Sequence, residues 1–190
     1  MYIDYPNVKM KEEYKPYQHN PPHLFIANAK YFITASTLGQ YHYLKSKDAK
    51  LAAFDYLTKS LDVYHWELED WVILDNHIHI MVNAPEDVAT LSNVMNNFHR
   101  FTANWLSKHQ IKRIREKYFH NYRDTCITFE KSYFTRLNYI WYNPVKHNYV
   151  DSPEKWEFGS YFYRFNEEYE EIQRIINKYP CDKVKIKDDF

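Results

Sequence analysis

Residues 71–83 have the sequence WVILDNHIHIMVN, an apolar run with two histidines near its centre. Successive side chains of a β-strand point to opposite faces of a sheet, so His77 and His79 share one face of a predicted strand. The alternate residues are apolar and point to the other face, toward a core: Ile78, Ile80 and Val82. Neutral imidazole is a common metal ligand, so the two histidines are a candidate pair of metal ligands.

Hydrophobic periodicity around this run predicts the elements in the order β-α-β-β-α-β-α. The expected strands cover residues 31–37, 66–74, 77–83 and 122–128. Helices are expected over 47–63, over an apolar stripe (Leu91, Val94, Met95, Phe98, Phe101 and Trp105), over 132–143 and, in the tail, over 167–179. Pro144 should end the third helix, because a residue before proline disfavours the helical conformation. This order predicts an α+β fold of the ferredoxin-like split βαβ type, with helices on one face of an antiparallel sheet. The other face is expected to carry the histidine pair and the helix over residues 132–143.

The composition indicates one domain with a single core, since 45% of the 190 residues are hydrophobic. We expect an extended N-terminal arm over residues 1–23, a catalytic domain over 24–162 and a helical tail over 163–190. The chain has two cysteines without a CxxC pair, and its N-terminus does not resemble a leader. It also has no run near about 18 apolar residues. These features predict a cytoplasmic protein without a membrane segment. Only two glycines are present, which excludes GxGxxG and P-loop nucleotide sites.

The net charge of the chain is zero, but one segment is strongly basic. The chain has 25 basic and 25 acidic residues, whereas residues 96–123 hold seven Lys or Arg against one Glu, a local charge of +6. Histidines and aromatic residues alternate with the basic residues in the same span. Phosphates attract such charges and unpaired bases stack on such rings, so the segment is a candidate surface for single-stranded nucleic acid. A solvated helix face with its aromatic residues in the core remains the alternative.

A second candidate group lies on the predicted helix 132–143. Stepping about 100° per residue places Leu137 and Trp141 opposite Tyr139, so Tyr139 is expected on the polar face. Asn143 follows one turn later, and a tyrosine hydroxyl and an amide oxygen therefore emerge together. Tyr142, about 60° away, is the alternative tyrosine on this helix.

The motif Asn76-His77-Ile78-His79, followed by residues 139–147 (YIWYNPVKH) and Val150, resembles the single-tyrosine HUH transposases. Within them it is most similar to the REP-associated tyrosine transposases, whose pattern is NHxH followed by YIxxNPVKxxxV. The strand at residues 31–34 (YFIT), the segment 101–103 (FTA) and residues 156–161 (WEFGSY) support the resemblance. The resemblance extends over about residues 23–161, with one motif on a strand and the other on a helix.

The resemblance implies that His77 and His79 bind a divalent metal, that Asn143 is a third ligand and that Tyr139 is the nucleophile. An imidazole and amide-oxygen shell suits Mg²⁺ or Mn²⁺. The implied reaction cleaves and rejoins single-stranded DNA beside a hairpin or palindromic repeat through a 5′-phosphotyrosine, and a homodimer is left open. The basic residues expected to contact DNA are Arg100, Lys108, Lys112, Arg113, Arg115, Arg136 and Lys146.

Three features depart from the family pattern. Asp75 replaces a proline before NHxH, the usual Trp-Gln element is not evident in residues 111–123, and the net charge is zero. One alternative function is a catalytically inactive domain of the same fold that binds single-stranded or hairpin DNA. Another is a zinc hydrolase on His77 and His79, which needs a further ligand, and no HExxH motif supplies one.

Overall fold

A four-stranded antiparallel sheet forms the centre of the structure, a computed structural model that describes residues 14–17, 20–24, 26–109, 117–165 and 168–181. Its spatial order is β4-β5-β3-β6, and the strands are β3 (Lys30–Ser36), β4 (Glu67–Ile73), β5 (His77–Asn83) and β6 (Arg123–Ile127). β5 pairs with β3 on one side and with β4 on the other. The strand that carries both histidines is therefore an interior strand, fixed in register on both edges.

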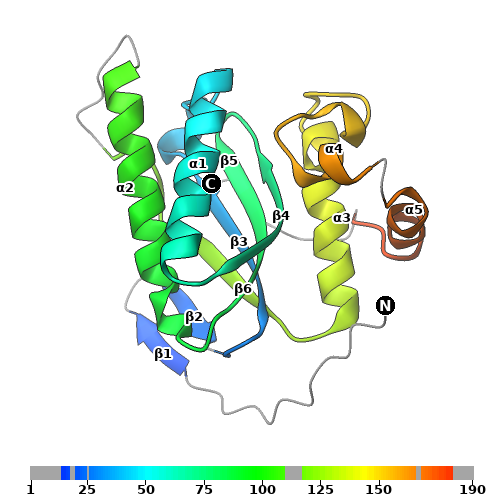
Figure 1. The fold of residues 1–190 in the computed structure, drawn as a ribbon, viewed down its shortest axis with the longest axis horizontal. Helices are drawn as coiled ribbons and strands as arrows, with labels where there is room; N and C mark the ends of the chain where they lie inside the picture. The colour runs from blue at the N-terminus through cyan, green and yellow to red at the C-terminus, as the bar shows by residue number, and fades with distance from the viewer. Residues whose placement is uncertain (1–13, 18–19, 25, 110–116, 166–167, 182–190) are drawn as a thin grey trace.

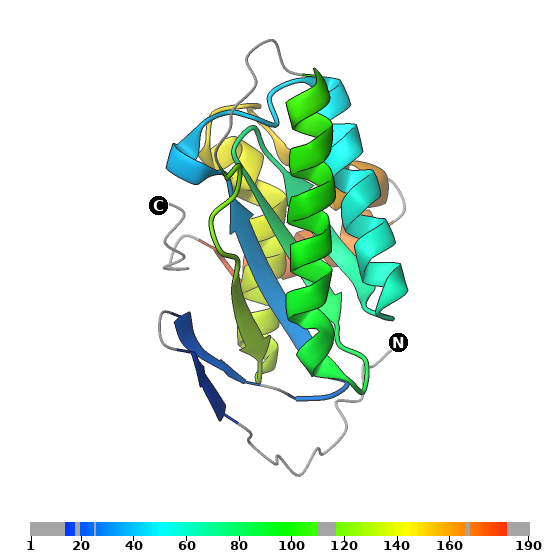
Figure 2. The same cartoon turned by 90° about the vertical axis from the view of Figure 1, so that its left-hand side faces the viewer.

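Helices cover both faces of the sheet (Figures 1 and 2). α1 (Lys47–Val63) and α2 (Leu91–His109) pack side by side on one face, and α3 (Glu130–Lys146) lies on the other. This arrangement confirms the predicted ferredoxin-like order β-α-β-β-α-β-α. Short 3₁₀ helices lie in the connections: η1 (Leu38–Gln40), η2 (Val88–Thr90) and η3 (Pro153–Lys155). No helix in the described parts of the chain is long and apolar enough to cross a membrane.

The two faces of β5 have different surroundings, as the alternation in the sequence predicts. Ile78 and Ile80 are fully buried in a cluster with α1 and α2. Met81 belongs to a second cluster, which contains Phe32 and the buried side chains of α3. His77 and His79 share the face of Met81, so both histidines are buried between the sheet and α3.

α3 is longer than predicted at both ends. It begins at Glu130 and continues past Pro144 to Lys146, so the predicted end at Asn143 was wrong. Proline has no N–H to donate, so it removes one hydrogen bond from a helix. In the last turn of α3 this is the loss of a single bond, and the helix continues. The N–H of His147 still donates to the Asn143 carbonyl at 3.1 Å and closes the turn.

The buried stripe of α2 differs from the expected one at Phe101 and Trp105, where Thr102 and Leu106 are buried instead. Trp105 is partly buried, whereas the Phe101 side chain is 40% exposed. The Phe101 ring stacks on Tyr56 of α1 at 5.9 Å between centroids, and the Arg100 guanidinium lies over it at 4.6 Å. The ring therefore packs along the α1 side of the helix instead of against the sheet.

Burial of His99 on α2 makes the stability of the fold depend on pH. Its ring stacks on Phe119, with centroids 4.6 Å apart, and burial lowers the pKa of His99 to about 3. The unfolded chain binds this proton below about pH 6.5 and the folded chain does not, so the stabilisation is present above pH 6.5 and is lost as the pH falls toward 3.

We expect His99→Phe to reduce the pH dependence of unfolding between pH 4 and 6 by about one proton, or about 1.4 kcal/mol per pH unit. Urea unfolding of both proteins across this range measures the slope. At pH 7.5 the histidine is neutral in both the folded and the unfolded chain. The difference in unfolding free energy between the wild-type and His99→Phe proteins at that pH therefore gives the packing cost alone. Identical slopes for the two proteins would show that His99 is not the titrating group.

The remaining described segments lie outside the four-stranded sheet. β1 (Tyr14–Tyr17) and β2 (Asn20–Leu24) form an antiparallel pair within the expected arm. After α4 (Ser160–Arg164), α5 (Tyr169–Lys178) packs on α3, where the Asn138 amide donates to the Tyr179 carbonyl at 2.9 Å. α5 is a helix within the expected tail and ends at Lys178, and the proposed domain boundaries stay predictions.

Candidate metal and tyrosine site

His77, at the start of β5, meets Asn143, near the end of α3. His77 Nε2 lies 3.0 Å from Asn143 Oδ1, and its Nδ1 lies 2.8 Å from Asn76 Oδ1. An amide oxygen only accepts hydrogen bonds, so a neutral His77 ring can donate to only one of these two oxygens. In the tautomer that donates from Nδ1, the Nε2 lone pair and Asn143 Oδ1 face each other at 3.0 Å as two potential ligands of one cation.

His79 lies deeper on the same face of β5. It is fully buried, and its Nδ1 is 2.8 Å from Thr34 Oγ1 on the paired strand β3. The Phe32 ring stacks on it at 5.4 Å between centroids. Such neighbours fix the orientation of an imidazole, as second-sphere groups do for metal-binding histidines. The sequence reasoning missed Thr34, although its place on the expected first strand was a usable signal.

Both imidazoles are neutral at physiological pH. Burial, reinforced by the nearby His147, lowers the pKa of His77 to about 4. Burial also holds the pKa of His79 well below its usual range, with His77 and Lys146 as further causes. A neutral imidazole is the form that binds a metal, so these histidines need no deprotonation at pH 7.

Tyr139 lies on the sheet side of α3 and is only 3% exposed. Its ring meets the His79 ring edge-on, with centroids 5.2 Å apart. Lys146 Nζ, two turns further along α3, donates to the Tyr139 hydroxyl at 2.9 Å. The expected polar face is therefore a buried one, because the side chains of Tyr139 and Asn143 point at the histidines instead of at water.

His147 is a neighbour of this site that the sequence reasoning missed. Its ring lies edge-on to His77, with centroids 4.9 Å apart, although it occupies a variable position of the motif. The spacing of one helical turn from Asn143 was a signal that could have found it. Tyr142, the alternative tyrosine, is half-buried in the second cluster, and burial raises its pKa.

The residues expected to bind DNA fall into three groups. Arg136 and Lys146 lie on α3 at the site. The Arg136 guanidinium packs over the Phe32 ring, and burial lowers the pKa of Arg136. Arg100 and Lys108 are exposed on α2, on the opposite face of the sheet. The remaining three lie outside the described residues: Lys112, Arg113 and Arg115.

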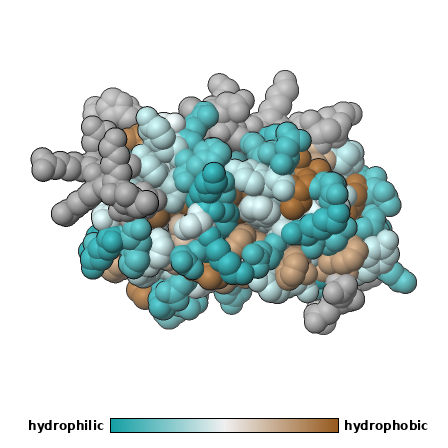
Figure 3. Space-filling model, turned by 90° about the horizontal axis from the view of Figure 1, so that it is seen from above, coloured by the Kyte–Doolittle hydropathy of each residue, from teal (hydrophilic) through white to brown (hydrophobic). Residues whose placement is uncertain are grey.

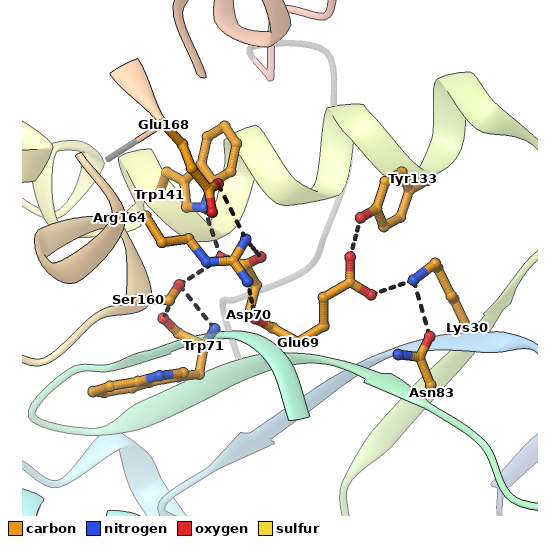
Figure 4. A network of polar contacts seen from close by, with 10 residues as sticks. All are labelled: Lys30, Glu69, Asp70, Trp71, Asn83, Tyr133, Trp141, Ser160, Arg164 and Glu168. Atoms are coloured by element: carbon orange, nitrogen blue, oxygen red, sulfur yellow. Dashed lines mark hydrogen bonds and ion pairs between the residues drawn. The ribbon is translucent and has the colours of Figure 1, made fainter. Parts of the chain in front are cut away.

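A buried carboxylate holds the tyrosine helix in place (Figure 4). Asp70 of β4 is fully buried and accepts from Trp141 Nε1 at 2.8 Å and from Ser160 Oγ at 2.5 Å. Arg164 on α4 pairs with its other oxygen at 2.8 Å. Burial raises the pKa of Asp70 to about 6, and the charge of Arg164 opposes that rise. Trp141 lies between Tyr139 and Asn143 along α3, so this network sets the position of both.

A β-bulge in β4 brings Asp70 to this network. The register with β5 shifts between Leu68 and Asp70. Leu68 and Trp71 pack toward α1, while Asp70 and the intervening Glu69 both face α3 and bond to it. A regular strand would place residues 68 and 70 on one face, and the extra residue of a bulge changes that alternation. The bulge thus gives the sheet two adjacent carboxylates toward the tyrosine helix.

Comparison with known proteins places these features in a family context. The family model described as "Transposase IS200 like" matches residues 25–143. A REP-associated tyrosine transposase of Haemophilus influenzae is 29% identical over 110 residues, which are 52% of this chain and 60% of that protein. The matched region therefore spans less than two thirds of that relative.

A solved structure supports the same fold. The structure of a REP-associated tyrosine transposase bound to a REP hairpin is similar to this one with a TM-score of 0.66. It is 19% identical in sequence, and the match covers 94% of each chain.

Proposed function

Because the chain belongs to the IS200-like transposase family, whose model matches residues 25–143, we propose that it cleaves and rejoins single-stranded DNA through Tyr139. One observation carries this proposal. The Tyr139 ring, the His79 ring and the facing pair of His77 and Asn143 lie together between β5 and α3 of a single chain. A nucleophile and a set of metal ligands so close together suit phosphoryl transfer.

The residues present fit a divalent metal. No three His, Cys, Asp or Glu side chains gather around a possible ion in the described parts of the chain, so the site needs the amide oxygen of Asn143 beside His77 and His79. His77 Nε2 and Asn143 Oδ1 are 3.0 Å apart, close enough for both atoms to hold the same divalent ion. Bound Mg²⁺ or Mn²⁺ would neutralise charge on the scissile phosphate and orient it.

The proposed chemistry exchanges one phosphate ester for another. The Tyr139 oxygen attacks phosphorus as the bond to the 3′ oxygen of the preceding nucleotide breaks. The phenolic proton lost is balanced by the proton that the departing 3′ oxygen takes up. The products are a 5′-phosphotyrosine and a 3′-hydroxyl, and the covalent link keeps the ester energy, so attack by a 3′-hydroxyl rejoins the strand without ATP.

Lys146 supports the nucleophile in this scheme. A free tyrosine has a pKa near 10, so about 4 kcal/mol separates it from the phenolate at pH 7. The Lys146 ammonium lies 2.9 Å from the Tyr139 oxygen and 4.7 Å from the ring centroid. A positive charge at that distance stabilises the negative charge that develops on the oxygen during attack. This role is more specific than the general DNA contact expected from the sequence.

We propose a DNA hairpin with single-stranded flanks as the substrate, since the similar solved structure is described as bound to a REP hairpin. The assay is a denaturing gel of the protein with end-labelled hairpins from its own genomic repeats, with Mn²⁺ present. A labelled band at protein mass that disappears with EDTA supports the proposal. Absence of an adduct, with the DNA still bound, would instead indicate the inactive binding domain.

The ligand assignment predicts how metal binding responds to substitution. His79→Ala should lower the affinity for Mn²⁺ by more than about 100-fold, and Thr34→Val, which removes the hydroxyl beside His79 Nδ1, by about 10- to 100-fold. Paramagnetic resonance of free Mn²⁺ measures both. His147→Gln is the matched control, because His147 contacts His77 but is not an assigned ligand. A loss for His147→Gln as large as that for His79→Ala would contradict the assigned set.

A further inference from the structure

The loop that joins β3 to α1 is bonded directly to the turn that carries the histidines. Thr37 N donates to the Asn76 carbonyl at 2.8 Å, and Leu44 N donates to the Asp75 carbonyl at 2.8 Å. The Asn76 side chain also donates to the Gln40 carbonyl at 3.4 Å. Because the same Asn76 side chain contacts His77 Nδ1, the loop is fixed in register with a proposed metal ligand.

Asp75 strengthens this connection. Its carboxylate is buried and pairs with the buried Lys50 of α1 at 2.6 Å, and with His42 of the loop at 3.4 Å. A proline at this position could form neither the ion pair with Lys50 nor the contact with His42. Asp75, which departs from the family pattern, therefore links the histidine turn to the loop and to α1.

Tyr41, within this loop, carries an aromatic ring that is 63% exposed. The ring packs on Gly39, where an added Cβ would come within 3.0 Å of Tyr41 Cε2. The Tyr43 ring lies beside it at 5.5 Å between centroids, and the Tyr41 carbonyl accepts from Thr37 Oγ1 at 2.6 Å. The ring is therefore held in position and still presented to solvent.

The loop and the site lie at the same end of the molecule. β3 ends, β5 begins and α3 ends there, as Figures 1 and 2 show. Figure 3 views this end from above, where hydrophilic residues predominate around smaller apolar patches. An exposed ring in such surroundings suits a polar, charged ligand that also has a flat apolar face.

We propose that Tyr41 stacks with an unpaired nucleobase of the DNA strand whose phosphate reaches the His77 and Asn143 pair. This inference rests on the proposed function and adds a binding position to it. Every nucleobase has a π face, so a fixed aromatic ring binds single strands with little sequence preference. A ring that is already ordered loses little conformational freedom on binding, which favours affinity.

The test uses the full-length Tyr139→Phe protein, which cannot attach to DNA, and an oligothymidine with one 2-aminopurine as the fluorescent probe. We expect quenching on binding, an affinity about tenfold lower for Tyr41→Ala, and near-normal affinity for Tyr41→Phe and Tyr41→Trp. Tyr163→Ala, on α4, is the matched control because Tyr163 is 62% exposed. Circular dichroism confirms that each variant is folded.

The inference would be overturned if Tyr41→Ala bound as tightly as the parent, or if Tyr163→Ala lost affinity equally. A parent protein that binds the probe without quenching any 2-aminopurine position would also overturn it. None of these results affects the proposed function, which depends on adduct formation by the wild-type protein. Conversely, a normal stacking result without any wild-type adduct would leave Tyr41 as part of a binding domain alone.

Discussion

Tyr139→Phe should abolish the covalent adduct with a labelled hairpin, a loss of at least about a thousandfold in rate. The substitution removes the nucleophilic oxygen of this side chain and keeps the ring against His79 and Phe32. DNA and metal binding should therefore persist, because neither depends on the hydroxyl. The measurement is single-turnover adduct formation on a denaturing gel, with DNA binding followed in parallel by fluorescence anisotropy.

Tyr142→Phe is the matched control for this experiment. Tyr142 lies three residues further along α3, is half-buried in the second cluster and is the alternative nucleophile. We expect its loss to leave the adduct intact. An adduct that survives in Tyr139→Phe and disappears in Tyr142→Phe would show that Tyr142 is the nucleophile. The proposal for Tyr139 would then be wrong, and α3 would have to be rotated relative to the histidines.

Asp70→Ala should be the most damaging single change to the fold, with a loss of about 3 to 5 kcal/mol in the free energy of unfolding. It leaves the Trp141 N–H, the Ser160 hydroxyl and the charge of Arg164 without their common acceptor. Asp70→Asn should cost less, since its amide oxygen can still accept from Trp141. Urea unfolding at pH 7 measures both variants.

Glu157→Ala is the matched control for the Asp70 variants. Glu157 forms an ion pair with Lys47 at 3.0 Å, but both side chains are at least half exposed. An exposed pair contributes little to stability, so we expect almost no change. Equal losses for Asp70→Ala and Glu157→Ala would show that the buried network does not hold α3. The folded fraction of Asp70→Ala should also form the adduct more slowly, because Trp141 shares the helix of Tyr139.

The sheet and its histidine face could be predicted from the sequence because they depend on local periodicity. The limits predicted for the helix over residues 47–63 match those of α1, and the alternation around Ile78 and Ile80 places both histidines on the face opposite α1 and α2. Period-two and helical spacing are properties of the chain itself. The family motif supplied the remaining roles, which spacing alone left open.

The features that could not be predicted depend on contacts between distant segments. Asp70 reads as an ordinary polar position on a strand until the bulge at Glu69 directs it to Trp141 and Arg164. Likewise, the sequence predicted for Lys146 only a general contact to DNA, and only the packing of α3 places it on the Tyr139 hydroxyl. Bulges and buried pairs are set by tertiary packing, which a single sequence does not display.

Mapping the attached nucleotide on the wild-type protein tests the central claim most directly. The protein reacts with a flanked hairpin and Mn²⁺, the DNA is trimmed with nuclease, and the peptides are analysed by tandem mass spectrometry. We predict a nucleotide linked through a 5′ phosphate to the phenolic oxygen of Tyr139, formed only when Mn²⁺ is present. A nucleotide on any other residue, or strand cleavage that leaves no covalent nucleotide, would contradict the account.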